Sequence, residues 1–323
     1  MKAITQDRYG DADVLPLRDI ERPTPGEGEV LVEVRAAGCG PDVWHTVTGK
    51  PYFARTMLGV RKPRTPARGL DLAGVVVETG PGVLGFAVGD EVYGGSKSGS
   101  FAELSLAKAD MLAPKPAGLS FEEAAAMPVS GCTALQALQR AETSPGMRVL
   151  VIGAGGGVGV YATQIAVAMG ATVTGVCSAG KADLVRSLGA TDVLDHAREE
   201  VDRDGPVYDV VVDTAGNRPI SLLRRAMTPK GALMIVGGDG GGSLTGGFER
   251  SLLAGAVSAF VSQRISGVIA TVRTDSLDEL ARLVATGAVR PVVGRTFALA
   301  DAADAVRAIG THHTTGKLVV TIP

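Results

Sequence analysis

The sequence predicts an α/β protein with two domains, one with short antiparallel strands in a barrel-like arrangement and one with a doubly wound parallel sheet. Its 323 residues are enough for two hydrophobic cores rather than one. Up to about Lys115, short apolar runs alternate with Pro and Gly, whereas from Met147 onward apolar runs alternate with segments of helical period. Glycine accounts for 44 residues and aromatic residues for only 4%, which favours many tight strand–helix turns.

Short strands separated by turn residues are expected in the first domain. They cover Val30 to Ala37, Leu72 to Thr79, Asp90 to Tyr93 and Phe101 to Leu106. Strands of this length and spacing favour an antiparallel, barrel-like domain. The segment Gly49 to Gly69, which we call the basic loop, is expected to lie on the surface. It carries Arg55, Arg61, Lys62, Arg64 and Arg68.

Two helices are expected to connect the domains. Ser120 and Glu123 have the spacing of a capping box, so the first helix is expected to begin directly after Ser120. Pro128 is expected to end this helix, because proline removes a backbone donor and disfavours helical continuation. The second helix is then expected over Cys132 to Ala141.

The parallel sheet is expected from Met147 onward. Apolar runs followed by helical segments are typical of βαβ units whose sheet is buried on both faces. The final strand, KLVVTI at 317–322, is expected to return to the first domain, because its neighbours are not part of the βαβ run. We therefore expect one domain of residues 1–120 and 290–323, and a second of residues 121–289.

Charge and cysteine content narrow the functional classes. Lys and Arg total 32 against 34 for Asp and Glu. The net charge of −2 does not indicate binding to nucleic acid or to an anionic membrane. The apolar stretch Ser251 to Gln263 is too short to span a bilayer, and the first residues lack the apolar core of a signal peptide. Cys39, Cys132 and Cys177 are expected to be free thiols in a reducing compartment, so a cytoplasmic protein is expected.

A glycine-rich turn that follows a predicted strand is the most informative motif. The strand VLVI leads into GAGGGVG, which opens a helix at about Val158. Glycine lets the backbone approach a pyrophosphate closely, and the start of a helix presents free N–H groups. A strict G-x-G-x-x-G is absent because alanine takes its first position, but the strand–turn–helix context still predicts dinucleotide binding. The expected contacts are Gly153, Ala154, Gly156, Gly157, Val158 and Gly159.

The end of the next strand predicts which dinucleotide is bound. An NAD site places Asp or Glu there for the ribose hydroxyls, but this strand ends in GVCSAGK and has no acid. Ser178 and Lys181 suit a 2′-phosphate instead, one with a hydroxyl and the other with a point charge. The alternative is that Ser178 only caps the helix that begins near Lys181. We expect NADPH rather than NADH.

Motifs along nearly the whole chain carry a family resemblance. They are GEVLVEVRAAG at 28–38, DLAGVVVETGPGV at 71–83, VGDEVYG at 88–94, GSFAEL at 99–104, AAAMPVSGCTALQAL at 124–138, GAGGGVGVYATQIA at 153–166, VRSLGATDVLD at 185–195, YDVVVDTAGN at 208–217 and GKLVVTI at 316–322. In their order and spacing the chain resembles the medium-chain dehydrogenases/reductases, in the zinc-independent quinone oxidoreductase (zeta-crystallin-like) branch. The resemblance implies a GroES-like catalytic domain built from both chain ends, a Rossmann domain between them, and NADPH. It also implies a small-molecule substrate and a homodimer formed through edge strands around Ser266 to Val272.

Zinc is not expected, in contrast to the alcohol dehydrogenases of the same superfamily. Catalytic zinc needs three protein ligands drawn from Cys, His and acids. The segment Gly69-Leu70-Asp71 stands where those enzymes have Gly-His-Glu, so an apolar side chain replaces the imidazole. The position of the third zinc ligand, a cysteine in those enzymes, falls near Val129. The position of the first ligand falls at Gly40, or at Cys39 if the alignment shifts by one residue.

Without a metal as Lewis acid, hydride transfer to an electron-poor alkene or a quinone is favoured over simple alcohol oxidation. Donors for the developing oxygen are expected in the segment 40–52. His45 and Tyr52 are the candidates, and Asp42 is expected to orient one of them. Relatives often have Asn near Gly40 and Tyr near His45, so the donors are not simply transferred. A purely structural role for each is the alternative.

The resemblance also implies further cofactor contacts. Some follow sheet strands, where open α/β sheets bind ligands, and others lie on the helix that faces the cleft or before the last strand. These residues are Thr133, His196, Ala215, Gly216, Asn217, Gly237, Gly238 and Lys317.

The expected function is NADPH-dependent, zinc-independent reduction of a quinone or an α,β-unsaturated carbonyl compound. Sparse aromatic residues leave little to stack a planar quinone, which favours enones. An enoyl-thioester reductase of fatty-acid or polyketide type is an alternative, and the basic loop would then meet the phosphates of the thioester carrier. A different class is a regulatory protein that binds NADPH without turnover.

Overall fold

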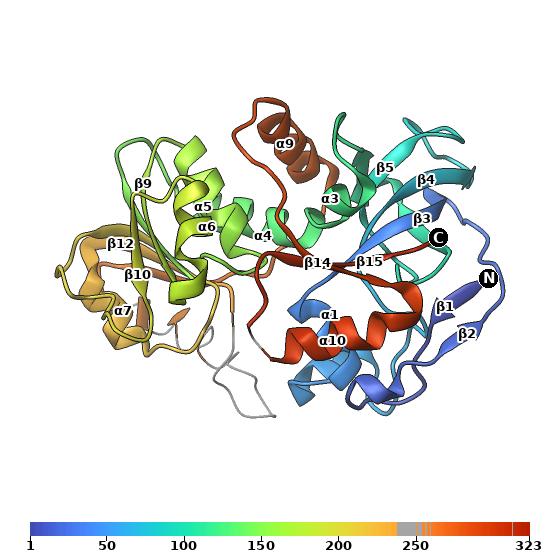
Figure 1. Ribbon diagram of the computed structural model, residues 1–323, viewed down its shortest axis with the longest axis horizontal. Helices are drawn as coiled ribbons and strands as arrows, with labels where there is room; N and C mark the ends of the chain where they lie inside the picture. The colour runs from blue at the N-terminus through green and yellow to red at the C-terminus, as the bar shows by residue number, and fades with distance from the viewer. Residues whose placement is uncertain (238–249, 251–253, 256, 259, 312) are drawn as a thin grey trace. The chain divides into compact units, whose positions relative to one another are not determined.

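The computed structural model describes residues 1–323 except 238–249, 251–253, 256, 259 and 312 (Figure 1). The described chain forms two compact units. The first comprises Met1–Cys132, Thr271–Ala285 and Arg290–Pro323, and the second comprises Thr133–Ala270 and Thr286–Val289. Among the described residues, no helix combines the length and the apolar character needed to cross a membrane.

A seven-stranded sheet forms the centre of the first unit. Its order is β14-β15-β3-β4-β5-β7, with β6 paired to β3, and every pair is antiparallel except the β14–β15 pair. The strands are β3 (Glu29–Cys39), β4 (Asp71–Thr79), β5 (Glu91–Gly95), β6 (Leu104–Lys108), β7 (Leu112–Pro114), β14 (Val293–Ala298) and β15 (Lys317–Thr321). β1 (Lys2–Ile4) and β2 (Leu17–Asp19) form a separate antiparallel pair.

Alternating side chains of this sheet form the core of the first unit. Val30 and Val32 of β3 and Leu72 of β4 are fully buried in one apolar cluster. Helix α10 (Ala302–Gly310) adds a face with helical spacing, which includes the buried Val306. The other helical segments are η1 (Ala12–Val14), α1 (Pro41–Thr48), η2 (Tyr52–Ala54), α2 (Arg55–Leu58), η3 (Ala109–Met111), α3 (Phe121–Ala125), α9 (Thr274–Ala285) and η5 (Leu299–Asp301).

The last strand returns to the first unit, as the sequence predicts. β15 pairs antiparallel with β3, from Leu318 opposite Cys39 to Thr321 opposite Ala36. Residues from both chain ends therefore build one sheet, and the antiparallel architecture of this unit is confirmed.

A six-stranded parallel sheet forms the second unit, in the order β10-β9-β8-β11-β12-β13. Its strands are β8 (Arg148–Ile152), β9 (Thr172–Cys177), β10 (Asp192–Asp195), β11 (Tyr208–Asp213), β12 (Met227–Ile235) and β13 (Arg264–Gly267), and its helical segments include α5 (Gly159–Ala168), η4 (Ala179–Lys181), α6 (Ala182–Ser187) and α7 (Ile220–Ala226). The near-continuous apolar runs of β8 and β11 fit a sheet buried on both faces. The strand order reverses between β8 and β11, which confirms the predicted Rossmann fold and marks the edge where such sheets bind ligands.

Three local features differ from the sequence prediction. The capping box of Ser120 and Glu123 forms as expected, but Pro128 begins helix α4 (Pro128–Arg140) rather than ending the one before it. Proline is well placed in the first turn of a helix, where its missing N–H would have no partner in any case. The segment 41–48 is a helix, and the basic loop contains η2 and α2.

Helix α9 lies in the first unit, whereas its residues fall within the 121–289 range expected for the second domain. Two hydrogen bonds explain its position. The Thr274 hydroxyl donates to the Leu112 carbonyl at 2.9 Å, and the buried Tyr93 hydroxyl donates to the Leu277 carbonyl at 2.6 Å. Such contacts, distant in sequence, are not visible in helical periodicity.

Candidate functional site

Three strand ends of the second unit approach one another around Thr214. The Thr214 hydroxyl donates to the Ile152 carbonyl at the end of β8, at 2.7 Å. A Cβ atom on Gly153 would come within 2.4 Å of the Thr214 hydroxyl oxygen, and one on Gly237 within 2.1 Å of the Thr214 carbonyl oxygen. Glycine is therefore required at both positions, and the ends of β8 and β12 present bare backbone. Gly238 lies outside the described residues.

The glycine turn after β8 has the close packing that a dinucleotide-binding turn requires. Gly153 has a φ of +80°, in the left-handed region. A Cβ on Gly159 would lie 2.1 Å from the Gly153 carbonyl oxygen, so α5 can pack this closely on the strand only with glycine there. At Gly156 a Cβ would lie 3.3 Å from the Gly153 carbonyl oxygen, a tight contact with the backbone of the turn itself. Ala154 is buried, whereas Gly157 and Val158 are half-buried before the helix. The turn fits a pyrophosphate.

Lys181 lies against this turn. A Cβ on Gly155 would come within 2.7 Å of Lys181 Cδ, so the lysine stem packs on the bare backbone of the turn. Burial lowers the pKa of Lys181, and the neighbouring Cys177 opposes this shift. Ser178 directly follows β9 and precedes η4, and its side chain makes no capping hydrogen bond. The alternative capping role of Ser178 therefore does not occur in this conformation.

His196 lies directly after β10, beside the end of β9. Its backbone N–H donates to the Cys177 carbonyl at 3.0 Å, and its side chain is exposed. Strand pairing thus brings Ser178 and His196 to one edge of the sheet, as expected for contacts to the adenosine side of a dinucleotide.

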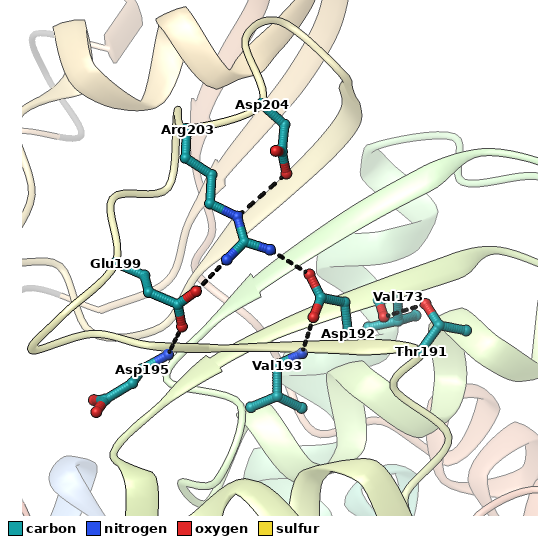
Figure 2. A network of polar contacts seen from close by, with 8 residues as sticks. All are labelled: Val173, Thr191, Asp192, Val193, Asp195, Glu199, Arg203 and Asp204. Carbon is teal, nitrogen blue, oxygen red and sulfur yellow. Dashed lines mark hydrogen bonds and ion pairs between the residues drawn. The ribbon is translucent and has the colours of Figure 1, made fainter.

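A network around Arg203 holds the segment that follows His196 (Figure 2). The Arg203 guanidinium contacts Asp192 at 2.8 Å, Asp204 at 3.4 Å and also Glu199. The second carboxylate oxygen of Glu199 accepts from the Asp195 N–H at 2.8 Å. These hydrogen bonds and charges raise the pKa of Arg203, although exposure opposes a large gain in stability from each pair. The network therefore fixes the segment that follows β10 against the strand.

The loop after β11 contains Ala215, Gly216 and Asn217, and the fully buried Asp213 shapes it. One Asp213 oxygen accepts from the Gly216 N–H at 2.9 Å, and the other lies 3.0 Å from an Arg250 nitrogen. Arg250 also donates to the Arg218 carbonyl at 2.6 Å. Sequence reasoning missed Asp213 and Arg250. Asp213 is recognisable as an acid that ends a strand, but its partner is 37 residues away and has no local signal.

A cavity of about 370 Å³ lies at this loop. Its lining consists of Gly216, Asn217, Arg218, Pro219, Ile220, Arg250 and Val257. It adjoins the carboxyl end of β11, where open α/β sheets place ligands. Thr133, on α4, is 8% exposed and does not line this cavity.

In the first unit, His45 lies on α1 with one ring nitrogen already engaged. Its Nδ1 lies 2.8 Å from the Lys50 carbonyl oxygen, and its ring packs edge-on against Trp44. A carbonyl accepts only, so Nδ1 carries a hydrogen and Nε2 is the nitrogen that can exchange a proton. Lys50, rather than the expected Asp42, orients His45. Tyr52 is 44% exposed, and the Arg55 guanidinium lies 4.7 Å from its ring centre.

Lys317 is buried within the first unit. Its Nζ lies 2.7 Å from Asp71 Oδ2 and donates to the Ser130 hydroxyl at 3.2 Å. The other Asp71 oxygen accepts from the Val129 N–H at 2.8 Å. Burial alone would lower the pKa of Lys317, but the charge and hydrogen bond of Asp71 and the charge of Asp42 raise it above its ordinary value. The structure therefore gives the ammonium a protein partner where the sequence suggested a cofactor phosphate.

Gly40 makes room for this charged cluster. A Cβ there would lie 2.5 Å from Asp42 Oδ1 and 2.9 Å from Lys317 Nζ. The Asp42 carboxylate therefore approaches the Lys317 ammonium across bare backbone. Asp42 Oδ2 is buried and has no hydrogen-bond partner among the described residues.

The residues at the expected zinc-ligand positions do not form a metal site. Leu70 provides no ligand atom, Asp71 is bonded to Lys317, and burial strongly raises the pKa of Cys39, which disfavours its thiolate. Across the part of the chain that the structure describes, no three His, Cys, Asp or Glu side chains are grouped to hold a metal. The three cysteines are free and buried, as predicted.

Comparisons with known proteins match both units. A family model described as the alcohol dehydrogenase GroES-like domain matches residues 26–117, and one described as zinc-binding dehydrogenase matches residues 188–320. The chloroplastic quinone-oxidoreductase QR1 of Triphysaria versicolor is 30% identical over 99% of this chain and 98% of its own length. The chloroplastic NADPH-dependent alkenal/one oxidoreductase of Arabidopsis thaliana is 34% identical over 99% of this chain and 79% of its own length. The structure of the quinone oxidoreductase from Coxiella burnetii has a TM-score of 0.85 and 29% identity, and covers 100% of this chain and 99% of that one.

We expect Lys317→Met to lower the free energy of unfolding by about 3–5 kcal/mol, because it leaves the Asp71 carboxylate buried and unpaired. The double variant Lys317→Met/Asp71→Leu should recover most of this loss, since it removes both charges. Urea unfolding measures both variants. A single variant that keeps its stability but loses affinity for NADPH would contradict the structural role and restore the cofactor-phosphate role.

Proposed function

The chain belongs to the quinone oxidoreductase branch of the medium-chain dehydrogenases/reductases, and from this premise we propose that it reduces a quinone or an α,β-unsaturated carbonyl compound with NADPH, without zinc. It is a nicotinamide-dependent oxidoreductase, and two of its relatives are named as NADPH- or NAD(P)H-dependent oxidoreductases. The observation that carries the finer proposal is the position of Lys181. Its stem packs on the glycine turn, beside a strand end that carries Ser178 and no acid.

The preference for NADPH rests on charge at the end of β9. An NAD site needs a carboxylate there to accept from the ribose hydroxyls, and a carboxylate would repel a 2′-phosphate. This strand end offers the Ser178 hydroxyl and the Lys181 ammonium instead. The exposed His196, held beside Cys177, adds a third group that can donate to a phosphate oxygen. The pyrophosphate would lie on the turn from Gly153 to Gly159. Ala215, Gly216, Asn217 and Gly237 would line the nicotinamide side.

NADPH supplies the hydride when it is bound. The residues of the chain then have to stabilise the oxygen on which negative charge develops, and to deliver a proton. His45 suits this task because its Nδ1 is fixed on Lys50 and its Nε2 can carry the proton. Tyr52 is the second candidate, and the Arg55 guanidinium lies 4.7 Å from its ring centre.

An enone fits better than a large quinone. Tyr52 and Phe53 are partly exposed, but the face of Tyr52 is already covered by Arg55, which leaves little aromatic surface for a planar ring. Leu70 stands where zinc-dependent relatives have a ligand histidine, so carbonyl polarisation by a metal finds no support in the residues present. An enoyl thioester remains the alternative substrate class.

For the cofactor, Lys181→Ala should weaken NADPH binding about 10- to 100-fold and leave NADH binding nearly unchanged, because a charged hydrogen bond to phosphate contributes about 1.5–3 kcal/mol. Titration followed by nucleotide fluorescence, with and without chelator, measures this. Arg186→Ala is the matched control, since Arg186 is a basic residue of α6, the helix that directly follows Lys181, and pairs with Asp183. Equal affinities of the unaltered protein for NADPH and NADH would rule out Ser178 and Lys181 as phosphate contacts.

For the proton donor, His45→Gln should lower kcat with an enone about 100-fold and leave NADPH affinity unchanged, because glutamine cannot transfer a proton. Stopped-flow and steady-state NADPH oxidation measure it, with the exposed His313→Gln as control. A fall in kcat that occurs in Tyr52→Phe but not in His45→Gln would assign proton donation to Tyr52. No oxidation of NADPH with any enone, quinone or enoyl thioester would instead favour the regulatory binding protein.

We also propose that the protein is cytoplasmic and forms a homodimer through β13. This strand is at the edge of the described parallel sheet and pairs there with β12. An edge strand can pair with its copy across a two-fold axis. Sedimentation velocity at micromolar concentration is expected to show a dimer, and a proline at Ile265 should shift it toward monomer. A monomer in the unaltered protein contradicts this proposal.

A further inference from the structure

Arg68, in the basic loop, is a buried cation that forms no ion pair within the described part of the chain. It is 6% exposed, and its Nε and Nη2 are buried with no hydrogen-bond partner among the described residues. Burial lowers its pKa to about 10, with only Tyr9 acting in the opposite direction. A phenol is neutral at pH 7, so it does not compensate the charge. Arg68 therefore stays protonated and uncompensated.

Two further arginines surround the same tyrosine. The Arg55 guanidinium lies 4.4 Å from the Tyr9 ring centre. Burial raises the pKa of Tyr9, and the charges of Arg55, Arg68 and Arg64 oppose that shift, so all three guanidinium groups act on this side chain. The Tyr9 hydroxyl donates to the Gly59 carbonyl at 2.7 Å. Three cations thus gather around a ring that cannot neutralise them.

Backbone carbonyls accept hydrogen bonds from Arg55 and Arg64 and hold these two side chains in place. Arg55 donates to the Gly49 carbonyl at 2.9 Å and to the Thr48 carbonyl at 3.3 Å, and Arg64 donates to the Thr56 carbonyl at 3.2 Å. No carboxylate of the described chain forms an ion pair with any of the three arginines. Their charges are therefore oriented but remain available to an anion.

Other polar atoms near Arg68 along the paired backbone also lack partners. Gln6 donates its N–H to the Pro66 carbonyl, and Ser100 donates its N–H to the Gly69 carbonyl, so both lie beside the segment that carries Arg68. Gln6 Oε1 and the Ser100 hydroxyl are buried without a hydrogen-bond partner in the described chain. Water can satisfy such neutral groups, but it does not neutralise a guanidinium.

The energetics require a partner for this charge. A buried charge without compensation is costly, and an apolar side chain of similar volume would remove the cost. The guanidinium fork matches the oxygens of a phosphate, and three cations suit a dianion better than a single carboxylate.

We propose that Arg68, with Arg55 and Arg64 near the same tyrosine, forms a binding site for a phosphate group. The phosphate is either the free ion or the phosphate ester of a small organic ligand. This site lies wholly within the first unit and goes beyond the proposed hydride transfer, because it needs neither a nucleotide nor turnover.

The test measures thermal stability of the nucleotide-free protein against inorganic phosphate, with chloride at matched ionic strength. The unaltered protein should gain roughly 2 °C or more in Tm on saturation, through ligand linkage. Arg68→Met should abolish this gain and raise Tm by roughly 2 °C in phosphate-free buffer, because it removes an uncompensated buried charge. Arg61→Met, an exposed arginine of the same loop, should behave like the unaltered protein.

Three results would overturn the proposal. They are a phosphate effect that persists in Arg68→Met, a Tm of Arg68→Met that falls in phosphate-free buffer, and a loss of NADPH affinity in that variant, which would assign Arg68 to the cofactor.

A second titration, with pantetheine 4′-phosphate, distinguishes a phosphate ester from the free phosphate ion as the ligand. Binding about 10-fold tighter than inorganic phosphate supports an ester ligand, and equal affinity supports the free ion. None of these measurements depends on turnover. The phosphate site can therefore be tested even if the protein proves inactive as a reductase.

Discussion

The buried ion pair of Lys317 and Asp71 fixes the architecture of the first unit. Asp71 begins β4, and its carboxylate holds Lys317 at the start of β15 with one oxygen and the Val129 N–H at the start of α4 with the other. One carboxylate therefore joins the last strand of the chain, a central strand and the entry to a helix. Without this pair, the return of β15 to β3 would leave a charged side chain buried and unpaired. The sheet that carries α1 and His45 depends on it.

The same ion pair also restricts the chemistry. Zinc-dependent members of the superfamily need side-chain ligands at positions that Leu70 and Val129 occupy here, and Asp71 already holds an ammonium. A fixed internal cation, the Lys317 ammonium, lies next to Asp42. Under the proposed function, the carbonyl oxygen of the substrate would be stabilised by proton donors, a demand that alkene or quinone reduction meets more easily than alcohol oxidation.

Local patterns were enough to predict much of the fold. The strand–turn–helix around Gly153, the capping box at Ser120 and the return of the last strand all follow from adjacent residues or from apolar periodicity. The start of α4 at Pro128 did not, because proline serves equally to begin or to end a helix. The Asp213–Arg250 pair and the Lys317–Asp71 pair join residues far apart in sequence, so no local pattern could indicate them.

The buried cations of this protein differ in one physical respect, and that difference separates scaffold from ligand site. Lys317 and Arg250 each contact a fully buried carboxylate, so their charges are balanced inside the fold and each holds two segments together. Arg68 is as well buried as Lys317, within a few per cent of exposure, but no carboxylate of the described chain pairs with it, and Tyr9, a neutral phenol, is its electrostatic neighbour. A buried ion pair whose charges balance can serve the fold alone. An unbalanced buried charge such as that of Arg68 is explained when its partner comes from solution.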